Sequence, residues 1–434
     1  MQILNWPNLS EAERKSALSR SPLVGDGSLE LSVSTIVNRV RVEKDTALLS
    51  YTQQFDGVSL TELRLSPDQI DSACTRVSED IKQAIAQAMA NIEVFHQAQK
   101  FEPVSVETQA GIRCELRSEA IEKVGLYIPG GTAPLISTVM MLALPARIAG
   151  CKQRVLVSPP PINDAIVYAA KECGITEIYQ VGGAQAIAAL AFGTESVPKV
   201  DKIFGPGNRF VTEAKKLVSQ DSHCVVSIDM PAGPSEVLVI ADKAANPEFI
   251  AADLLSQAEH GPDSQVMLVT DCEILAIKVN AALNRQLETL PRMEIAQLAL
   301  ESSRTLLVAD MQQATQVSNL YGPEHLIIQT EAPRELLTSI RAAGSVFLGA
   351  YTPESVGDYA SGTNHVLPTY GYSRAVSSLS LADFSRRFTV QELSAEGLLA
   401  IGETVMTLAA AELLDAHKNA IKIRLDSLTA RNAS

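Results

Sequence analysis

The sequence predicts an α/β protein with two Rossmann-like, doubly wound domains, a helical N-terminal region and a helical C-terminal tail that contacts a partner. Short apolar strands alternate with helical stretches from residue 124 onwards, which is typical of parallel sheets covered by helices on both faces. Turns rich in Gly and Pro end these strands. At 434 residues the chain is also too long for one ordinary domain.

Residues 1–123 are predicted to form a helical region that packs with the second α/β domain. Ser78 is suited to cap a helix whose first turn carries Glu79 and Asp80. Apolar residues follow it at helical spacing and predict the buried face of that helix, namely Ile81, Ile85, Met89, Ile92 and Phe95.

The first Rossmann-like domain is predicted over residues 124–234. Its strands are expected at 124–128, 155–158, 176–180 and 201–204, each followed by a turn with Gly or Pro. Since parallel strands run the same way, these turns gather at the carboxyl edge of the sheet, where such folds bind ligands. The glycines that follow residue 204 match only the first half of the GxGxxG fingerprint, so glycine spacing alone does not identify a dinucleotide site.

The second Rossmann-like domain is predicted over residues 235–380. Its helix is expected at 247–260, and its strands at 236–241, 265–270, 306–309, 326–329 and 345–348. The tail, 381–434, is predicted to hold helices at 390–399 and 401–423 and no strand. Because two short helices cannot bury a core alone, the tail is expected to pack on the rest of the chain or on a partner subunit.

Composition narrows the class of protein. With 46% hydrophobic and 20% charged residues, the chain can bury large cores. A net charge of −14 without a cluster of Lys and Arg excludes a nucleic-acid-binding surface. The most apolar stretch, 134–151, is interrupted by Pro145 and Arg147, so it predicts a buried helix rather than a membrane span. The N-terminus lacks the pattern of a signal peptide, and six cysteines without a CxxC pair indicate reduced thiols and a cytoplasmic location.

Two groups of polar residues are candidates for chemistry. Asp253, Gln257 and His260 have i, i+4, i+7 spacing on the predicted helix at 247–260. Such a stripe is either a solvated face or part of a metal or proton-transfer site. Glu324 and His325 stand side by side just before a strand, which suits general acid–base catalysis, and equally suits two loop residues that cap a strand.

Two further groups lie towards the C-terminus. The segment 357–365 is dense in Gly, Asp, Asn and His, and its Asp358 and His365 are suited to bind a metal or to position a substrate. Glu412 and His417 lie on the last predicted helix, where they matter to a site only if the tail reaches another subunit. Nitrogen and oxygen ligands without a thiolate suit Zn²⁺ or another borderline divalent ion that also accepts substrate atoms.

Several long segments together resemble the histidinol dehydrogenase family, and they cover the chain from about residue 100 to its end. They are GLYIPGGTAPL (125–135), VGGAQAIAALAFGT (181–194), KIFGPGN (202–208), DMPAGPSEV (229–237), SQAEHGPDSQV (256–266), YGPEHL (321–326), GDYASGTNHVLPT (357–369) and AAAELLDAHKNA (409–420). The resemblance implies a zinc-dependent, NAD-linked enzyme that oxidises L-histidinol to L-histidine through an aldehyde with two NAD⁺, the last step of histidine biosynthesis.

The resemblance also implies roles for individual residues. The implied zinc ligands, for one ion per subunit, are Gln257, His260, Asp358 and His417. The implied acid–base residues are Glu324 and His325. The implied substrate contacts are Ser235, Gln257, His260, His325, Asp358, His365, Glu412 and His417. The implied NAD contacts are Tyr127, Gln185 and Asn208. The family is a homodimer whose tail completes the partner's site, so His417 is expected to act across the interface.

Three other functions remain open at this point. A cysteine-dependent aldehyde dehydrogenase would use Cys114 or Cys151 as its nucleophile. A zinc hydrolase would use Gln257, His260 and Glu324 for attack by water, and would leave the glycine-bearing strand ends without a nucleotide. A non-catalytic metabolite-binding protein built from two α/β lobes would show no turnover.

Overall fold

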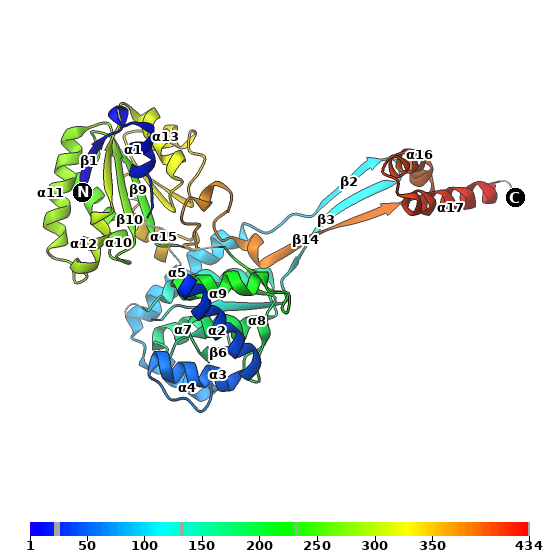
Figure 1. Cartoon of the computed structure of the whole chain (residues 1–434), viewed down its shortest axis with the longest axis horizontal. Helices are drawn as coiled ribbons and strands as arrows, with labels where there is room; N and C mark the ends of the chain where they lie inside the picture. The colour runs from blue at the N-terminus through cyan, green and yellow to red at the C-terminus, as the bar shows by residue number, and fades with distance from the viewer. Residues whose placement is uncertain (21–26, 131–133, 231–232, 433–434) are drawn as a thin grey trace. The chain divides into compact units, whose positions relative to one another are not determined.

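The computed structural model describes residues 1–20, 27–130, 134–230 and 233–432 (Figure 1). The described chain forms two compact units. The first unit consists of Met1–Gln99 and Ile121–Phe384, and the second of Lys100–Ala120 and Ser385–Ser434. Residues 131–133, within the turn predicted after the first strand, lie outside the described residues.

The first unit contains two parallel sheets of the same design. The first sheet has the order β6-β5-β4-β7-β8, and the second has the order β1-β11-β10-β9-β12-β13. Counted from β4 in one sheet and from β9 in the other, both follow the doubly wound order 3-2-1-4-5, with β1 added at one edge of the second sheet. The predicted fold class, two Rossmann-like sheets, is confirmed.

The strands of the first sheet are β4 (Lys123–Tyr127), β5 (Gln153–Ser158), β6 (Glu177–Gln180), β7 (Lys202–Phe204) and β8 (Ser227–Ile228). Its connecting helices are α6 (Ile136–Ala149), α7 (Asp164–Glu172), α8 (Gly183–Phe192) and α9 (Arg209–Gln220). The apolar stretch at 134–151 is the buried helix α6, as predicted.

The strands of the second sheet are β1 (Gln2–Asn5), β9 (Glu236–Ala241), β10 (Gln265–Thr270), β11 (Arg304–Leu307), β12 (His325–Gln329) and β13 (Ser345–Leu348). Its helices are α10 (Pro247–Ala258), α11 (Glu273–Leu287), α12 (Met293–Glu301), α13 (Met311–Tyr321), α14 (Pro333–Leu337) and α15 (Glu354–Tyr359). Two short 3-10 turns, Tyr372–Arg374 and Leu381–Phe384, follow in the first unit.

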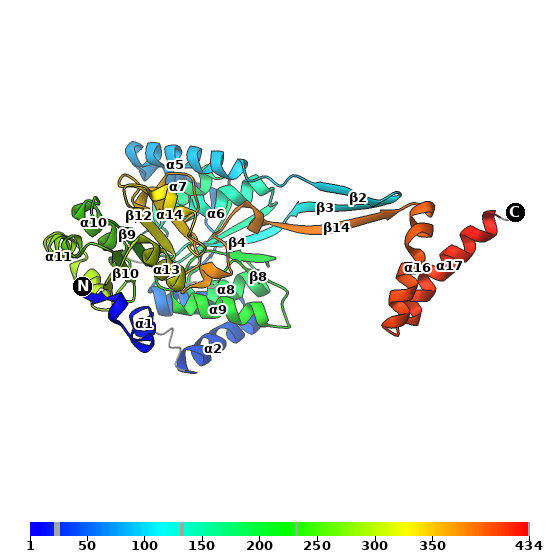
Figure 2. The same cartoon turned by 90° about the horizontal axis from the view of Figure 1, so that it is seen from above.

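Alternate side chains of the first sheet enter two separate cores, because successive residues of a strand point to opposite faces. Leu126, Leu156 and Ile178 pack under α6 and α7. Val155 and Tyr179 lie in the core beneath α2 and α8. Figure 2 shows α5, α6 and α7 along one face of this sheet and α2, α8 and α9 along the other.

The N-terminal residues divide between the two sheets. Strand β1 pairs in parallel with β11, and a 3-10 turn (Trp6–Asn8) and α1 (Glu11–Ala17) follow it. The next helices contribute to the cores of the first sheet. They are α2 (Gly27–Glu43), α3 (Asp45–Tyr51), the π-helical turn Thr52–Asp56, α4 (Pro67–Arg76) and α5 (Glu79–Gln97). Strand β1, a four-residue edge strand, was not predicted.

Helix α5 begins after its N-cap residue Ser78 as predicted, although the side chain of Ser78 makes no capping hydrogen bond. The predicted apolar face is partly wrong. Ile85 and Ile92 are buried, whereas Ile81 and Phe95 are 41% and 45% exposed. The helix instead buries a line of residues spaced three and four apart, namely Ile85, Ala88, Ile92 and His96.

The second unit holds an antiparallel sheet and two helices. Its strands, in the order β14-β3-β2, are β2 (Val104–Gln109), β3 (Ile112–Ala120) and β14 (Ser385–Leu393). Helices α16 (Ala395–Ala411) and α17 (Asp415–Asn432) follow. The prediction of a tail without strands is wrong at 385–393, because these residues pair with β3 along their whole length. The helix predicted at 390–399 begins only at Ala395, because Val390 and its neighbours belong to the strand.

No helix among the described residues is both long enough and apolar enough to cross a membrane.

Candidate active site

The predicted acid–base and metal residues of the second sheet gather at its amino edge. His325 begins β12 and pairs in register with Val237, the second residue of β9. Helix α10 follows β9 and runs back across the sheet, so its last turn, with Gln257, returns to the edge where β9 begins. His260 lies just beyond that helix, and Asp358 comes from α15.

His325 lies at the centre of this group. Its Nδ1 is 2.8 Å from Gln257 Nε2 and 3.0 Å from the carbonyl oxygen of Glu236. Its Nε2 is 3.4 Å from Asp358 Oδ1. Burial alone would lower the pKa of His325, but the carboxylates of Glu324 and Asp358 outweigh it and raise that pKa to about 10. The imidazole therefore has a polar neighbour beside each nitrogen, and the two carboxylates favour its protonated form.

Glu324 is a buried carboxyl group, 7% exposed. Its Oε2 accepts a hydrogen bond of 2.8 Å from the backbone N–H of Glu236 and lies 3.6 Å from His325 Nδ1. Burial raises the pKa of Glu324 to about 8, although His325 opposes the rise. A carboxyl group with its pKa raised in this way is suited to exchange protons near neutral pH.

Asp358 and His365 are joined by a loop that returns to the first sheet. His365 Nδ1 is 2.9 Å from the backbone oxygen of Asp358, and His365 Nε2 is 3.1 Å from Thr138 Oγ1 on α6. Burial would raise the pKa of Asp358, but the contact with His325 outweighs it and lowers that pKa. Asp358 is thus an anionic oxygen that faces the imidazole.

Ser235 and His260 lie together at the same edge, with Ser235 Oγ 3.4 Å from His260 Nδ1. The structure thus brings together Ser235, Gln257, His260, Glu324, His325, Asp358 and His365. The polar stripe on α10 is not a solvated face, because Asp253 and Gln257 are 6% and 0% exposed.

The residues of this group suit a divalent cation in one respect. Gln257 Oε1 is buried and has no hydrogen-bond partner among the described residues, and neither has His325 Nε2. A buried amide oxygen without a partner is costly unless a ligand satisfies it. In the described ranges, no three or more His, Cys, Asp or Glu residues lie so that they alone could hold a metal. A metal ion here would therefore need a ligand of another type, such as the amide oxygen of Gln257. The assignment of Gln257, His260, Asp358 and His417 as metal ligands stays a prediction.

Glu412 and His417 belong to the second unit. Glu412 ends α16, His417 lies in the first turn of α17, and both side chains are exposed. The helix pair around them leaves large apolar side chains exposed, among them Leu399, Leu408, Leu413, Leu414 and Ile423.

The predicted NAD contacts lie at the carboxyl edge of the first sheet. Tyr127 ends β4 and Asn208 follows β7, and these two strands are neighbours at the point where the strand order reverses. The N–H of Gly183 donates to Tyr127 Oη at 3.2 Å, and burial raises the pKa of Tyr127 to about 12. Gln185 lies on the first turn of α8 and is buried. A hollow of about 330 Å³ opens at the same edge, beyond the ends of β4 and β5.

A buried ion pair shapes the glycine turn after β7. Lys215 on α9 pairs with Asp229 and donates to the carbonyl of Gly205 at 3.0 Å. Asp229 Oδ2 in turn accepts from the N–H of Gly205 at 2.8 Å. Gly205 has a φ of +124°, and a Cβ there would lie 2.1 Å from the carbonyl oxygen of Tyr127. Only glycine fits this turn, which leads into Asn208.

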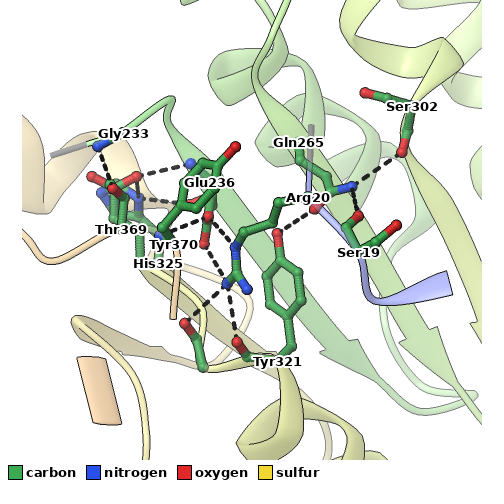
Figure 3. Close-up of polar contacts among 12 residues, drawn as sticks. Ser19, Arg20, Gly233, Glu236, Gln265, Ser302, Tyr321, His325, Thr369 and Tyr370 are labelled. Atoms are coloured by element: carbon green, nitrogen blue, oxygen red, sulfur yellow. Dashed lines mark hydrogen bonds and ion pairs between the residues drawn. The ribbon is translucent and has the colours of Figure 1, made fainter. Parts of the chain in front are cut away.

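Two residues near the acid–base pair were missed by the sequence reasoning, namely Arg20 and Glu236. They form a buried ion pair in which both Nε and Nη2 of Arg20 contact the Glu236 carboxylate (Figure 3). A lone carboxylate at the start of the otherwise apolar run at 236–241 was the signal for Glu236. No local pattern marks Arg20, because its partner is more than two hundred residues away in the chain.

Comparisons with known proteins agree with this geometry. The model of the family described as histidinol dehydrogenase matches residues 21–425. A histidinol dehydrogenase from Shewanella oneidensis is 73% identical over 436 residues, covering 99% of this chain and 100% of that protein. One from Escherichia coli K12 is 58% identical over 426 residues, covering 98% of each chain.

A solved structure gives the same result. The crystal structure of histidinol dehydrogenase from Elizabethkingia anophelis superposes with a TM-score of 0.95 at 48% identity and covers 99% of both chains. The resemblance read from the sequence segments is therefore confirmed. This chain belongs to the histidinol dehydrogenase family and is an oxidoreductase.

Proposed function

We propose that this protein oxidises L-histidinol to L-histidine through the aldehyde with two NAD⁺, the last step of histidine biosynthesis, and that it uses Zn²⁺. The observation that carries the proposal is the buried group of Glu324, His325 and Asp358 at the amino edge of the second sheet. A base and a carboxyl group side by side match the two proton transfers that the two oxidations need.

The proposed base of the alcohol step is His325. Its Nδ1 lies 3.0 Å from the carbonyl oxygen of Glu236, which favours a proton on that nitrogen and leaves Nε2 as the proton acceptor. Once the imidazole has released the second proton that the carboxylates favour, Nε2 takes the hydroxyl proton as hydride leaves. Glu324 is the proposed base that activates water for attack on the aldehyde. The backbone N–H of Glu236 fixes one oxygen of Glu324, which leaves the other for water.

Gln257, His260 and Asp358 are the proposed zinc ligands in this chain, and His417 of a second copy is the proposed fourth. The support within this chain is the buried, unpartnered Oε1 of Gln257 beside the anionic Asp358. A zinc ion bound there would supply a Lewis acid for the amino and imidazole nitrogens of the substrate. Ser235 and His365 are the proposed neighbours of the substrate from the first unit.

NAD⁺ is proposed to bind at the carboxyl edge of the first sheet, with Tyr127, Gln185 and Asn208 as contacts. Support comes from their place at the reversal of the strand order and from Asn208 as N-cap of α9, since helix N-termini favour phosphate.

A homodimer is the proposed assembly, with Glu412 and His417 completing the site of the partner subunit. The support is the exposed apolar surface of α16 and α17, which includes Leu408 at 60% and Leu413 at 87% exposure. A cytoplasmic location is part of the proposal, and its support is that all six cysteines are free.

The cysteine-dependent alternative has little support. Burial raises the pKa of Cys151 to about 11, and its Sγ lies 3.6 Å from the carbonyl of Phe384. A thiol with its pKa raised by burial is a poor nucleophile. Cys114 lies on β3, which belongs to the second unit, whereas Glu324, His325 and Asp358 belong to the first.

The deciding experiment measures NADH formation and zinc content together. Histidinol should drive the reduction of NAD⁺, and chelation should abolish it along with the bound zinc. Glu324→Gln should spare the alcohol step and block oxidation of the aldehyde. A zinc hydrolase would form no NADH. Activity that survives complete metal removal would contradict the zinc site. Equal loss of both steps in Glu324→Gln would contradict the separate roles of Glu324 and His325.

A further inference from the structure

An ion pair between Arg20 and the buried Glu236 lies beside the acid–base residues (Figure 3). The side chain of Glu236 is 2% exposed and that of Arg20 is 12% exposed. Burying two charges costs free energy that their attraction offsets only when the geometry is good and the remaining donors are satisfied. A pair of this kind is weak support for stability, so its position calls for another role.

Arg20 contacts residues at the amino ends of two neighbouring strands, β9 and β12. Its guanidinium contacts both oxygens of Glu236, with Nη2 to Oε2 at 2.8 Å. The same Nη2 donates to the carbonyl oxygens of Tyr321 at 3.0 Å and Gly322 at 3.2 Å. The guanidinium also lies 3.8 Å from the centre of the Tyr321 ring. Arg20 therefore ties the start of β9 to the segment that leads into β12.

The backbone of Glu236 holds both acid–base residues at once. Its N–H donates to Glu324 Oε2 at 2.8 Å, and its carbonyl oxygen is 3.0 Å from His325 Nδ1. Its side chain also accepts from the N–H of Tyr370 at 2.9 Å. Any shift of this peptide would move Glu324 and His325 together.

Arg20 is itself fixed by a second set of contacts. Gln265 Nε2 donates to the carbonyl of Ser19 at 3.0 Å, and Gln265 Oε1 accepts from Tyr321 Oη at 2.7 Å. Gln265 and Tyr321 are both buried. The N-terminal segment thus reaches the site through a closed network rather than through one exposed side chain.

We propose that Arg20, through Glu236, is a positioning residue for the reaction: it fixes the peptide at Glu236 so that Glu324 and His325 keep their relative geometry. The inference rests on the proposed acid–base roles of these two residues. Lysine should replace arginine only in part, because its single ammonium group cannot make the paired contact with both carboxylate oxygens.

The test compares Arg20→Met and Arg20→Lys with a control on the same segment, Arg14→Met. Arg14 also donates to a backbone carbonyl, that of Trp6 at 3.3 Å, and lies 5.4 Å from the Trp6 ring, but among the described residues it makes no contact with Glu236, Glu324 or His325. The measurements are kcat with histidinol, kcat with the aldehyde, KM for NAD⁺, zinc content and the thermal unfolding midpoint.

We expect Arg20→Met to lower kcat in both half-reactions by about 10- to 100-fold, the range found for outer partners of site residues. KM for NAD⁺ should stay unchanged, Arg20→Lys should recover part of kcat, and Arg14→Met should keep full kcat. If Arg20→Met does not fold, the neutral pair of Arg20→Met with Glu236→Gln should show the same loss of kcat, and Arg20→Lys should show a smaller loss.

A folded Arg20 variant with unchanged kcat would overturn the positioning role, as would a loss of kcat that only follows the unfolded fraction. These outcomes are distinct from a failure of the proposed function, in which the unaltered protein itself would form no NADH from histidinol.

Discussion

The two parallel sheets of the first unit share one strand order but present their candidate chemistry at opposite edges. The first sheet carries Tyr127 and Asn208 at its carboxyl edge, beside a turn that only Gly205 fits. The second carries Glu324 and His325 at its amino edge. The general rule for doubly wound sheets concerns the carboxyl edge, so it applies to the first sheet alone.

The helix that follows the first strand differs between the two sheets in the kind of residues that it buries. Helix α6 buries ten residues in a row, and apart from Ser137 and Thr138 they are apolar. Helix α10, in the equivalent place, buries Asp253 and Gln257. The same topology thus supports a dry core in one sheet and a polar site in the other, because the residues on one helix differ.

Replacing the imidazole of His325 should have the largest effect on kcat and should leave NAD⁺ binding at the other sheet almost unchanged. We expect His325→Ala to lower kcat by about 10²- to 10⁴-fold, the usual contribution of a general acid or base. KM for NAD⁺ should change little, since the proposed cofactor contacts lie on the other sheet. Steady-state kinetics with histidinol checks both values, and a large rise in KM for NAD⁺ would mean that the two edges do not work separately.

The buried carboxyl group of α10 should make stability depend on pH. Burial raises the pKa of Asp253 to about 7, against a hydrogen bond of 2.6 Å from Gln329 Nε2. Below the unfolded pKa of about 3.9 the carboxyl is protonated in both states. Between that pKa and pH 7 the unfolded chain has lost the proton, whereas the folded protein keeps it. The free energy of unfolding therefore falls by about 1.4 kcal/mol for each pH unit over this range.

Asp253→Asn should remove this dependence, because the amide stays neutral and can also reach Gln329 Oε1, which has no partner among the described residues. We expect the variant to unfold at a higher temperature than the unaltered protein at pH 8, with a smaller gain at pH 6. Thermal unfolding at both pH values is the measurement. An equal gain at the two values would show that Asp253 is ionised in the folded protein throughout this range.

The glycine turn of the first sheet should tolerate no side chain. Gly205→Ala places a Cβ against the carbonyl of Tyr127, so we expect a loss of about 1–3 kcal/mol in stability and a higher KM for NAD⁺, with zinc content unchanged. Gly349→Ala is the control. Gly349 also has a positive φ, +87°, but it follows β13 in the second sheet and has open space around it. Unaltered NAD⁺ binding in Gly205→Ala would separate this turn from the cofactor.

Much of this comparison could be predicted from the sequence. The strands at 236–241 and 265–270 were predicted at their observed bounds, because buried strands are apolar runs ended by turns. The edge strand β1 and the strands β2, β3 and β14 of the second unit were missed, since exposed strands lack such a run. The polar cluster was predicted from local spacing and from the resemblance, but Arg20 was not, because its role depends on a contact between distant segments.

The smallest expected effect concerns two helix caps at the carboxyl edges. Asn208 caps α9 in the first sheet through Oδ1, which accepts from the N–H of Phe210 at 3.0 Å, and Asn246 caps α10 in the second, accepting from Glu248 at 2.9 Å. Aspartate keeps the capping oxygen, so both Asn→Asp variants should retain their stability within a few tenths of a kcal/mol. Only at Asn208 does the side-chain amide nitrogen lie at the proposed cofactor edge.

Asn208→Asp should therefore raise KM for NAD⁺ several-fold, which corresponds to the loss of one hydrogen bond of about 1 kcal/mol, while Asn246→Asp should leave KM unchanged. Kinetics and thermal unfolding on the two variants measure the two quantities separately. Equal KM values would mean that the Asn208 amide nitrogen makes no contact with NAD⁺. A fall in stability confined to Asn208→Asp would instead show that the negative charge disturbs the buried Lys215–Asp229 pair beneath α9.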